Sequence, residues 1–339
     1  MGQFFAEYGL FLLKVITIVA AIVVIVVVAA SAGRRASHEG LEVESLNKKF
    51  RSLADSLRAA ISTKEQKKQA AKARKKEEKA ESKSPSTKPR SFVIDFKGDL
   101  KASAVPSLRE EVSAILDVIA EGDDVIVRLE NHGGVVHEHG LAASQLARIR
   151  DREIPLLVCV DKVAASGGYL MACVASKVYA APFAILGSIG VLAQIPNFNR
   201  MLDSHGVDFE QITAGKHKRT VTMFGKNTDE DRAKLKEELE DVHTLFKDAV
   251  SKYRPELDLD KIATGEHWYG TRALELGLTD EIKTSDELLK ELAADRDLYR
   301  VTYNIKKPLP KRLMSNIDGL LEKADAASWR RRFESRLPR

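Results

Sequence analysis

Short apolar runs alternate with longer segments of helical periodicity over residues 91–305 of this chain. The short runs are rich in Val, Ile and Leu, as β-strands are, and apolar residues in the longer segments recur as on one face of a helix. Strands that alternate with helices are typical of an α/β domain with mostly parallel strand pairing. We therefore predict an α/β domain over residues 91–305. Its expected strands are 92–96, 125–129, 155–160 and 177–180, and its expected helices include 105–120, 141–150 and 228–252.

Apolar residues are densest near the N-terminus. Residues 15–33 contain no charged side chain and are dominated by Val, Ile and Ala. A helix of this length, at about 1.5 Å per residue, spans the hydrocarbon core of a bilayer, about 30 Å thick. The stretch is longer than the apolar core of a cleaved signal peptide, and the flank before it contains Glu7 with a single basic residue, Lys14. We predict that residues 1–35 are a retained anchor that contacts the lipid bilayer through residues 9–33.

Residues 36–90 have the composition of a linker. Apolar residues at spacings of three to five from Leu41 to Ile61 predict a helix from about residue 40. Residues 64–90 then contain eleven basic and four acidic side chains, a net charge of +7, and too few apolar residues to form a core. We predict a linker that is helical at first and then disordered. Because the chain's net charge of +5 resides in this linker, we do not expect a nucleic-acid-binding surface.

Residues 306–339 form a separate basic segment. Its apolar residues fall on one helical face, and Arg330, Arg331 and Arg332 follow close behind. A basic amphipathic tail of this kind can lie on an anionic membrane surface or pack on a neighbouring subunit. The sequence leaves both alternatives open.

Two cysteines, Cys159 and Cys173, lie inside predicted core segments and outside any CxxC or Cys/His cluster. We therefore expect neither a disulfide framework nor a zinc site. Cysteine is among the residue types most often buried, so we interpret both as inert core thiols.

Three glycine-containing turns carry the candidate chemistry. The first, Asn-His-Gly-Gly at 131–134, ends a predicted strand, and the second, Ser-Gly-Gly at 166–168, opens a predicted helix. The third, Gly-Ser-Ile-Gly at 187–190, precedes an apolar run. Glycine allows a backbone to approach a ligand closely. A serine between a strand and a helix, followed by two glycines, is typical of a nucleophile beside an oxyanion hole.

The base for such a serine is not obvious from spacing. None of the eight histidines lies in a recognisable general-base context, so a Ser-His triad is disfavoured. A neutral lysine can take the proton, provided that an apolar pocket or nearby cations lower its pKa from about 10.4 to roughly 7 to 8. Spacing does not choose among Lys162, Lys216 and Lys218.

Three motifs in order resemble the signal peptide peptidase family: Ala-Ala-Ser-Gly-Gly-Tyr at 164–169, Gly-Ser-Ile-Gly-Val at 187–191 and Gly-Lys-His-Lys at 215–218. The resemblance covers roughly residues 91–285, and residues 268–280 resemble the closing segment of the family's fold. It implies a fold like those of ClpP and the crotonases, built from repeated ββα units, and a Ser-Lys catalytic dyad.

The resemblance also implies residue roles. Ser166 would be the nucleophile, Lys218 the general base, and Ser188 the residue that orients the lysine through a hydrogen bond. The oxyanion hole would be the amide of Gly167 with one from Gly133 or Gly134. This chain has Asn-His at 131–132 where the family usually has Ser-Pro, so we expect a different stiffness of that loop.

The resulting hypothesis is a membrane-anchored serine endopeptidase that cleaves signal-peptide-derived or misfolded polypeptides without metal or cofactor. We expect a homo-oligomer in a bacterial inner membrane, with the peptidase domain in the periplasm, although Arg34 and Arg35 favour the cytoplasm by the positive-inside rule. Two alternatives remain: an acyl-CoA enzyme of the crotonase type, and a catalytically silent membrane scaffold.

Overall fold

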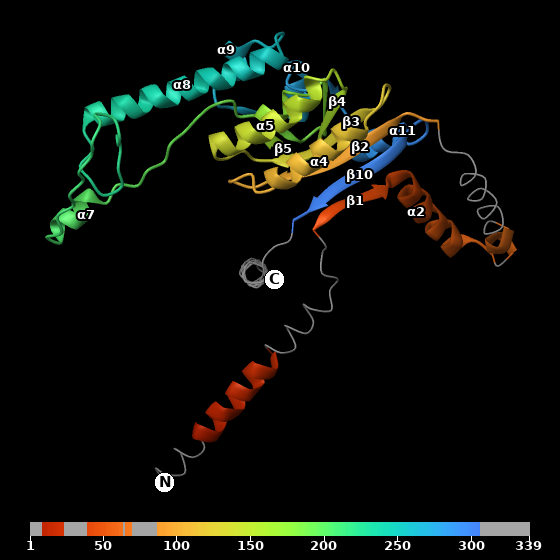
Figure 1. Cartoon of the computed structure of the whole chain (residues 1–339), viewed down its shortest axis with the longest axis horizontal. Helices are drawn as coiled ribbons and strands as arrows, with labels where there is room; N and C mark the ends of the chain where they lie inside the picture. The colour runs from red at the N-terminus through yellow and green to blue at the C-terminus, as the bar shows by residue number, and fades with distance from the viewer. Residues whose placement is uncertain (1–8, 24–38, 64, 70–86, 306–339) are drawn as a thin grey trace, which may run out of the picture. The chain divides into compact units, whose positions relative to one another are not determined.

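The structure is a computed structural model that describes residues 9–23, 39–63, 65–69 and 87–305 (Figure 1). Residues 9–23 are helical, and their apolar side chains are exposed. Within the described ranges, no helix is long and apolar enough to cross a membrane. The predicted anchor continues to residue 33 and so runs outside those ranges, as do most of the basic linker and the whole of the tail, residues 306–339. The predictions made for these segments remain predictions.

Residues 41–303 form one compact unit, built on a ten-stranded sheet with the order β1-β10-β2-β3-β4-β6-β9. The short strands β5, β7 and β8 lie off this path: β5 pairs with β3 and β7, and β8 with β7. The strands are β1 (Gly40–Ser45), β2 (Arg90–Gly98), β3 (Asp124–Asn131), β4 (Leu156–Val160), β5 (Val163–Ala165), β6 (Lys177–Ala180), β7 (Ile185–Gly187), β8 (His267–Tyr269), β9 (Glu281–Ile282) and β10 (Asp297–Asn304).

Helices cover both faces of this sheet. They are α2 (Leu46–Ile61), α4 (Val105–Val118), α5 (Val136–Arg150), α6 (Gly167–Ala172), α7 (Asn199–Ser204), α8 (Asp229–Tyr253), α9 (Leu259–Ile262), α10 (Gly270–Glu275) and α11 (Ser285–Leu292). The pairs β2–β3, β3–β4 and β4–β6 are parallel, whereas β7–β8 is antiparallel. The predicted α/β class with mostly parallel pairing is confirmed.

Successive residues of the central strands enter two different cores. On β2, Phe92, Ile94 and Phe96 pack in the larger core with α4 and α5, whereas Val93 packs in the smaller core with α2 and α11. Adjacent side chains of a strand point to opposite faces, so a strand covered on both sides reads as a continuous apolar run. That burial explains why these strands were recognisable in the sequence.

The N-terminal edge of the unit differs from the expectation. Residues 40–45, which the apolar spacing assigned to a helix, form β1 beside β10. The following helix α2 is fixed by Asn47, whose amide donates to the carbonyls of Ala293 (3.1 Å) and Arg296 (2.9 Å) and accepts from the Leu298 N–H (2.7 Å). The folded unit therefore includes a strand and a helix that precede residue 91.

Helix α8 extends away from the sheet, and α7 lies near its N-terminal end (Figure 1). Only Phe246 and Val250, both near the C-terminal end of α8, are buried on this helix. Most side chains of residues 191–228, which include α7, are exposed. We call residues 191–240 the arm.

Candidate active site

Ser166 lies in a tight turn between β5 and α6. Its backbone torsions, φ 53° and ψ −122°, lie in a region that few residues other than glycine adopt. The turn is held because the Ser166 N–H donates to the Gly187 carbonyl (2.8 Å) and its own carbonyl accepts from the Leu170 N–H (3.0 Å). Such strain, about 1 to 3 kcal/mol, persists where the surrounding structure imposes it, and it is frequent at active sites.

The hydroxyl of Ser166 is not used to cap the helix that follows. Ser166 occupies the N-cap position of α6 but makes no side-chain capping hydrogen bond. Serine at this position usually caps through its hydroxyl oxygen. The side chain is half-buried and is therefore available for chemistry.

The glycine loop, residues 131–134, packs directly against this turn. Asn131, the last residue of β3, pairs with Ala164 of β5, which brings the two segments together. Gly133 has φ 84°, and a Cβ on it would lie 2.7 Å from the Ser166 Cβ and 2.8 Å from the Gly167 nitrogen. Only glycine fits at position 133, because the backbone there is left-handed and lies too close to Ser166 for a Cβ atom.

The amides around Ser166 differ in their hydrogen bonding. The Gly133 N–H donates to the Asn131 Oδ1 (2.9 Å). Among the described residues, the N–H groups of Gly134 and Gly167 have no such partner. Gly167 is the first residue of α6, where the N–H has no acceptor within the helix. Among the three glycine amides named here, those of Gly134 and Gly167 are thus without a hydrogen-bond partner in the described part of the chain.

Ser188 follows Gly187, whose carbonyl accepts the hydrogen bond from the Ser166 N–H. It has φ 52°, and its N–H donates to the Glu266 carbonyl (2.6 Å). Its side chain is half-buried, and within the described part of the chain its hydroxyl makes no hydrogen bond. The structure thus brings Ser166, Ser188 and the glycine loop together.

Lys218 lies elsewhere. It belongs to an exposed turn of the arm, closed by the Lys218 N–H and the Gly215 carbonyl (3.1 Å), and the neighbouring Lys216 pairs with Glu230 on α8 (3.3 Å). Across the described residues, the ammonium group of Lys218 makes no hydrogen bond to Ser166 or Ser188. A single copy of the described unit therefore holds the serine and the lysine on separate elements.

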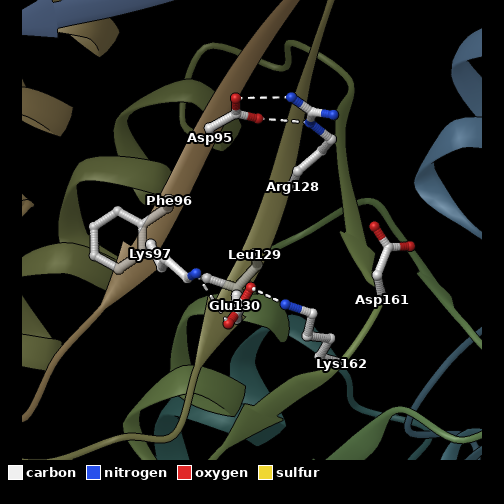
Figure 2. A pocket seen from close by; sticks show the side chains of 8 residues that line it. All are labelled: Asp95, Phe96, Lys97, Arg128, Leu129, Glu130, Asp161 and Lys162. Atoms are coloured by element: carbon white, nitrogen blue, oxygen red, sulfur yellow. Dashed lines mark hydrogen bonds and ion pairs between the residues drawn. The ribbon is translucent and has the colours of Figure 1, made fainter. Parts of the chain in front are cut away.

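The other two candidate lysines are engaged by carboxylates. Lys162 lines a pocket of about 290 Å³ beside the ends of β2, β3 and β4, and its ammonium group lies 3.1 Å from Glu130 (Figure 2). Lys97 contacts the same carboxylate at 3.3 Å, and Arg128 forms two hydrogen bonds with Asp95.

These ion pairs lower the pKa of Glu130. Burial would raise the pKa of Glu130, but the hydrogen bonds from Lys162 and Lys97 outweigh it and hold this pKa below its usual range. Lys162 and Lys216 each form an ion pair with a carboxylate, whereas Lys218 is not paired within the described residues.

Other candidate nucleophiles and ligands give no site in the described residues. Cys159 and Cys173 are free and buried, and burial raises the pKa of each thiol to about 12. Both stay protonated at neutral pH, which agrees with their interpretation as core thiols. The described ranges contain no group of His, Cys, Asp and Glu residues placed to hold a metal ion.

Sequence reasoning missed one buried polar pair beside the glycine loop. His139 of α5 and Asn131 are both fully buried, with the His139 Nε2 lying 3.2 Å from the Asn131 Oδ1. The available signal was the helical spacing of His139 with Ala142, Ala143 and Leu146, which places this histidine on the buried face of α5.

Family models match two adjoining segments that together span most of this chain. Residues 3–146 match the N-terminal region of peptidase family S49, and residues 148–299 match peptidase family S49 itself. Protease SohB of Haemophilus influenzae is 46% identical over 326 residues, which cover 92% of each chain. Protease SohB of Buchnera aphidicola subsp. Schlechtendalia chinensis is 45% identical over 85% of this chain and 99% of its own.

Solved structures of a membrane-bound stomatin-specific protease also align with this chain. One covers 68% of this chain and 99% of its own, with a TM-score of 0.37 and 14% identity. A likeness at this level carries no argument about the site.

Proposed function

This chain belongs to peptidase family S49, and on that premise we propose that it is a membrane-anchored serine endopeptidase with Ser166 as nucleophile and Lys218 as general base. The observation that carries the proposal is the strained Ser166 turn with Gly133 packed against it and two unpartnered amides beside it. A hydroxyl next to backbone donors is the arrangement that acyl transfer requires.

The proposed reaction has two halves. Neutral Lys218 accepts the Ser166 Oγ proton while Oγ bonds to the carbonyl carbon of the scissile peptide, and the amides of Gly134 and Gly167 stabilise the oxyanion. The lysine ammonium then gives its proton to the leaving nitrogen as the C–N bond breaks. Water, deprotonated by the lysine, attacks the acyl ester and releases the new carboxylate together with free Ser166. Ser188 is proposed to orient the lysine amine.

Two observations support Lys218 over the other lysines. Lys162 and Lys216 form ion pairs with carboxylates, whereas Lys218 has no such pairing within the described residues. Lys218 is also the lysine that the family resemblance of the Gly-Lys-His-Lys motif at 215–218 implies.

The fold is proposed to be of the ClpP and crotonase kind. In support, β4 is followed by the short off-path strand β5 and then by α6, which makes one ββα unit. The next pair, β6 and β7, repeats the alternation of a main-sheet strand with a short off-path strand.

A homo-oligomer is proposed to complete the site. Lys218 lies on the arm, away from Ser166 of the same copy, and the arm exposes large apolar side chains such as Leu192, Met201 and Ile212. Exposed apolar clusters of this kind are typical of protein interfaces. We propose that the arm packs against a second copy of this chain and supplies Lys218 to its Ser166.

The cellular context is proposed from the sequence alone. Residues 9–33 would anchor the chain in a bacterial inner membrane, with the peptidase domain in the periplasm, and membrane-derived or misfolded polypeptides would be the substrates. A reporter fused after residue 339 tests the side of the membrane. Activity of a cytoplasmic reporter alone would contradict the periplasmic placement.

A fluorophosphonate probe, which reacts with activated serines, tests the enzymatic proposal on the full-length chain in detergent. We expect labelling of the wild type and no labelling of the Ser166→Ala variant. The Ser204→Ala variant is the control, because Ser204 is an exposed serine on α7, and it should be labelled normally. A wild-type protein that is not labelled and does not cleave denatured protein would contradict the proposal and favour a silent scaffold.

A further inference from the structure

Asn131 connects the glycine loop to the interior. Its side chain is fully buried at the end of β3, where the Oδ1 accepts a hydrogen bond from the Gly133 N–H (2.9 Å) and lies 3.2 Å from the His139 Nε2. The Nδ2 donates to the Met171 sulfur (3.3 Å). One amide side chain thus joins the loop, α5 and α6.

His139 packs against Gly167, the residue that follows Ser166. Its ring is fully buried, its Nδ1 lies 3.0 Å from the Val135 carbonyl, and a Cβ placed on Gly167 would lie 2.5 Å from its Cγ. The ring therefore lies directly beneath the residue that follows Ser166. The Asn131–His139 pair contacts both segments that provide oxyanion donors.

Packing alone does not require polar groups at these two positions. Burying an amide and an imidazole costs free energy unless their hydrogen bonds are made, so apolar side chains would fill the space at a lower desolvation cost. What the pair adds is a fixed acceptor for the Gly133 N–H and a fixed orientation of the loop. A mispositioned donor costs catalysis steeply, since one oxyanion donor is worth about 10²- to 10³-fold in kcat.

We propose that Asn131 and His139 are positioning residues for the oxyanion hole. They hold the Gly133 amide out of the reaction and fix the Gly134 and Gly167 amides as the two donors. This inference rests on the proposed peptidase function. It assigns a role in catalysis to a helix histidine that is not the base.

The test uses the full-length chain in detergent and a fluorogenic peptide, with kcat, KM and the melting temperature measured for each variant. Asn131→Ala removes the acceptor oxygen, whereas Asn131→Ser keeps an oxygen that can accept from an N–H two residues on. His139→Leu removes the ring nitrogens, and His139→Gln keeps a donor. Leu146→Ala, also buried on α5, is the control for destabilisation without loss of the polar pair.

We expect Asn131→Ala and His139→Leu to lower kcat at least about tenfold with KM changed less than about twofold, since the oxyanion forms only in the transition state. Asn131→Ser and His139→Gln should recover most of that loss. Should one of Asn131→Ala and His139→Leu fail to fold, the other still tests the pair, because each removes the contact between the Asn131 Oδ1 and the His139 Nε2.

Two results would overturn the inference. One is a kcat within twofold of wild type in folded Asn131→Ala and His139→Leu. The other is a loss of kcat that is proportional to the fall in melting temperature in every variant, Leu146→Ala included. Failure of the proposed function is a separate result, because the wild type itself would then resist the fluorophosphonate probe.

Discussion

Gly133 and Ser166 are held so close that the Ser166 turn leaves no room for a side chain on Gly133. Gly133 combines φ 84° with a Cβ position 2.7 Å from the Ser166 Cβ. Alanine at this position would be strained by its backbone and would displace the nucleophile. The tolerance of this site for substitution is therefore set by two independent constraints.

We predict that Gly133→Ala destabilises the protein by about 2 to 4 kcal/mol, through left-handed strain and overpacking. Displacement of the nucleophile should lower kcat/KM by about 10²-fold or more. Thermal unfolding and peptide hydrolysis measure the two effects. Gly140→Ala is the control: a Cβ there meets nothing within 4 Å, and helix propensity should make it neutral or slightly stabilising. Equal behaviour of the two variants would refute the packing argument.

Glu111 on α4 gives a pH dependence of stability. Its carboxylate is 5% exposed and accepts from the Tyr303 N–H (2.8 Å), and burial, with a smaller contribution from Asp95, raises its pKa to about 7. A raised pKa means that the folded state binds the proton more tightly than the unfolded state. The contribution of this group to stability is therefore most favourable at low pH and falls as pH rises from about 4.5 to about 7.

We predict that Glu111→Gln, which keeps an oxygen acceptor for Tyr303, stabilises the protein by about 1 to 3 kcal/mol at pH 8 and has little effect at pH 4. Denaturant unfolding at several pH values measures this difference. The exposed neighbour Glu110→Gln is the control and should show no such trend. A stabilisation of Glu111→Gln that is equal at both pH values would contradict the burial argument.

At the scale of elements, α2 is joined to the folded unit by the buried amide of Asn47 as well as by apolar packing of Leu46 and Phe50. Asn47 makes three hydrogen bonds to the backbone before and within β10, and one of its partners, the Leu298 N–H, is buried. Loss of the side chain leaves that N–H unsatisfied. The contact helps to explain how a helix that precedes residue 91 is part of the same unit as Ser166.

We predict that Asn47→Ala costs about 2 to 4 kcal/mol of unfolding free energy, because buried backbone groups lose their partners. Chemical denaturation of the full chain measures the change. Ser56→Ala on the exposed face of the same helix is the control and should change stability by less than about 0.5 kcal/mol. An Asn47→Ala variant as stable as Ser56→Ala would show that α2 is only loosely attached.

At the scale of the whole molecule, the separation of Lys218 from Ser166 makes self-association a requirement of the proposed mechanism. Helix α8 is buried only near its C-terminal end, beyond the arm, and Ile212 on the arm is 94% exposed. Under the proposed mechanism, a second copy that receives the arm would gain both apolar burial and a general base.

We predict that the Ser166→Ala and Lys218→Ala variants are each inactive and that reassociated mixtures of the two recover activity, up to about a quarter of wild type for random mixing in a closed ring. Native mass measurement verifies that mixed oligomers form. Lys216→Ala is the matched control and should be active by itself. Mixed oligomers without recovery would show that each copy supplies its own lysine, and a monomeric active enzyme would refute the role of the oligomer.

The sequence by itself determined the α/β class and singled out Ser166 as the candidate nucleophile. The central strands are buried on both faces, so they appear as continuous apolar runs, and Ser166 lies in a local strand-turn-helix whose glycines are adjacent in the chain. Both are short-range signals. Residues 40–45 were misassigned because the apolar spacing of a short edge strand also fits a helix, and only pairing with β10, some 250 residues away, decided between them.

Only the tertiary structure decided how the site is built. Proximity of Gly133 to Ser166, the choice of Gly134 over Gly133 as the free amide, and the buried Asn131–His139 pair all depend on β3, β5 and α5 meeting in space. Likewise, the structure shows ion pairs for Lys162 and Lys216 and none for Lys218 within the described residues, a difference that spacing in the sequence could not reveal. The physical reason is that hydrogen bonding and burial are set by non-local neighbours, which a local sequence pattern does not encode.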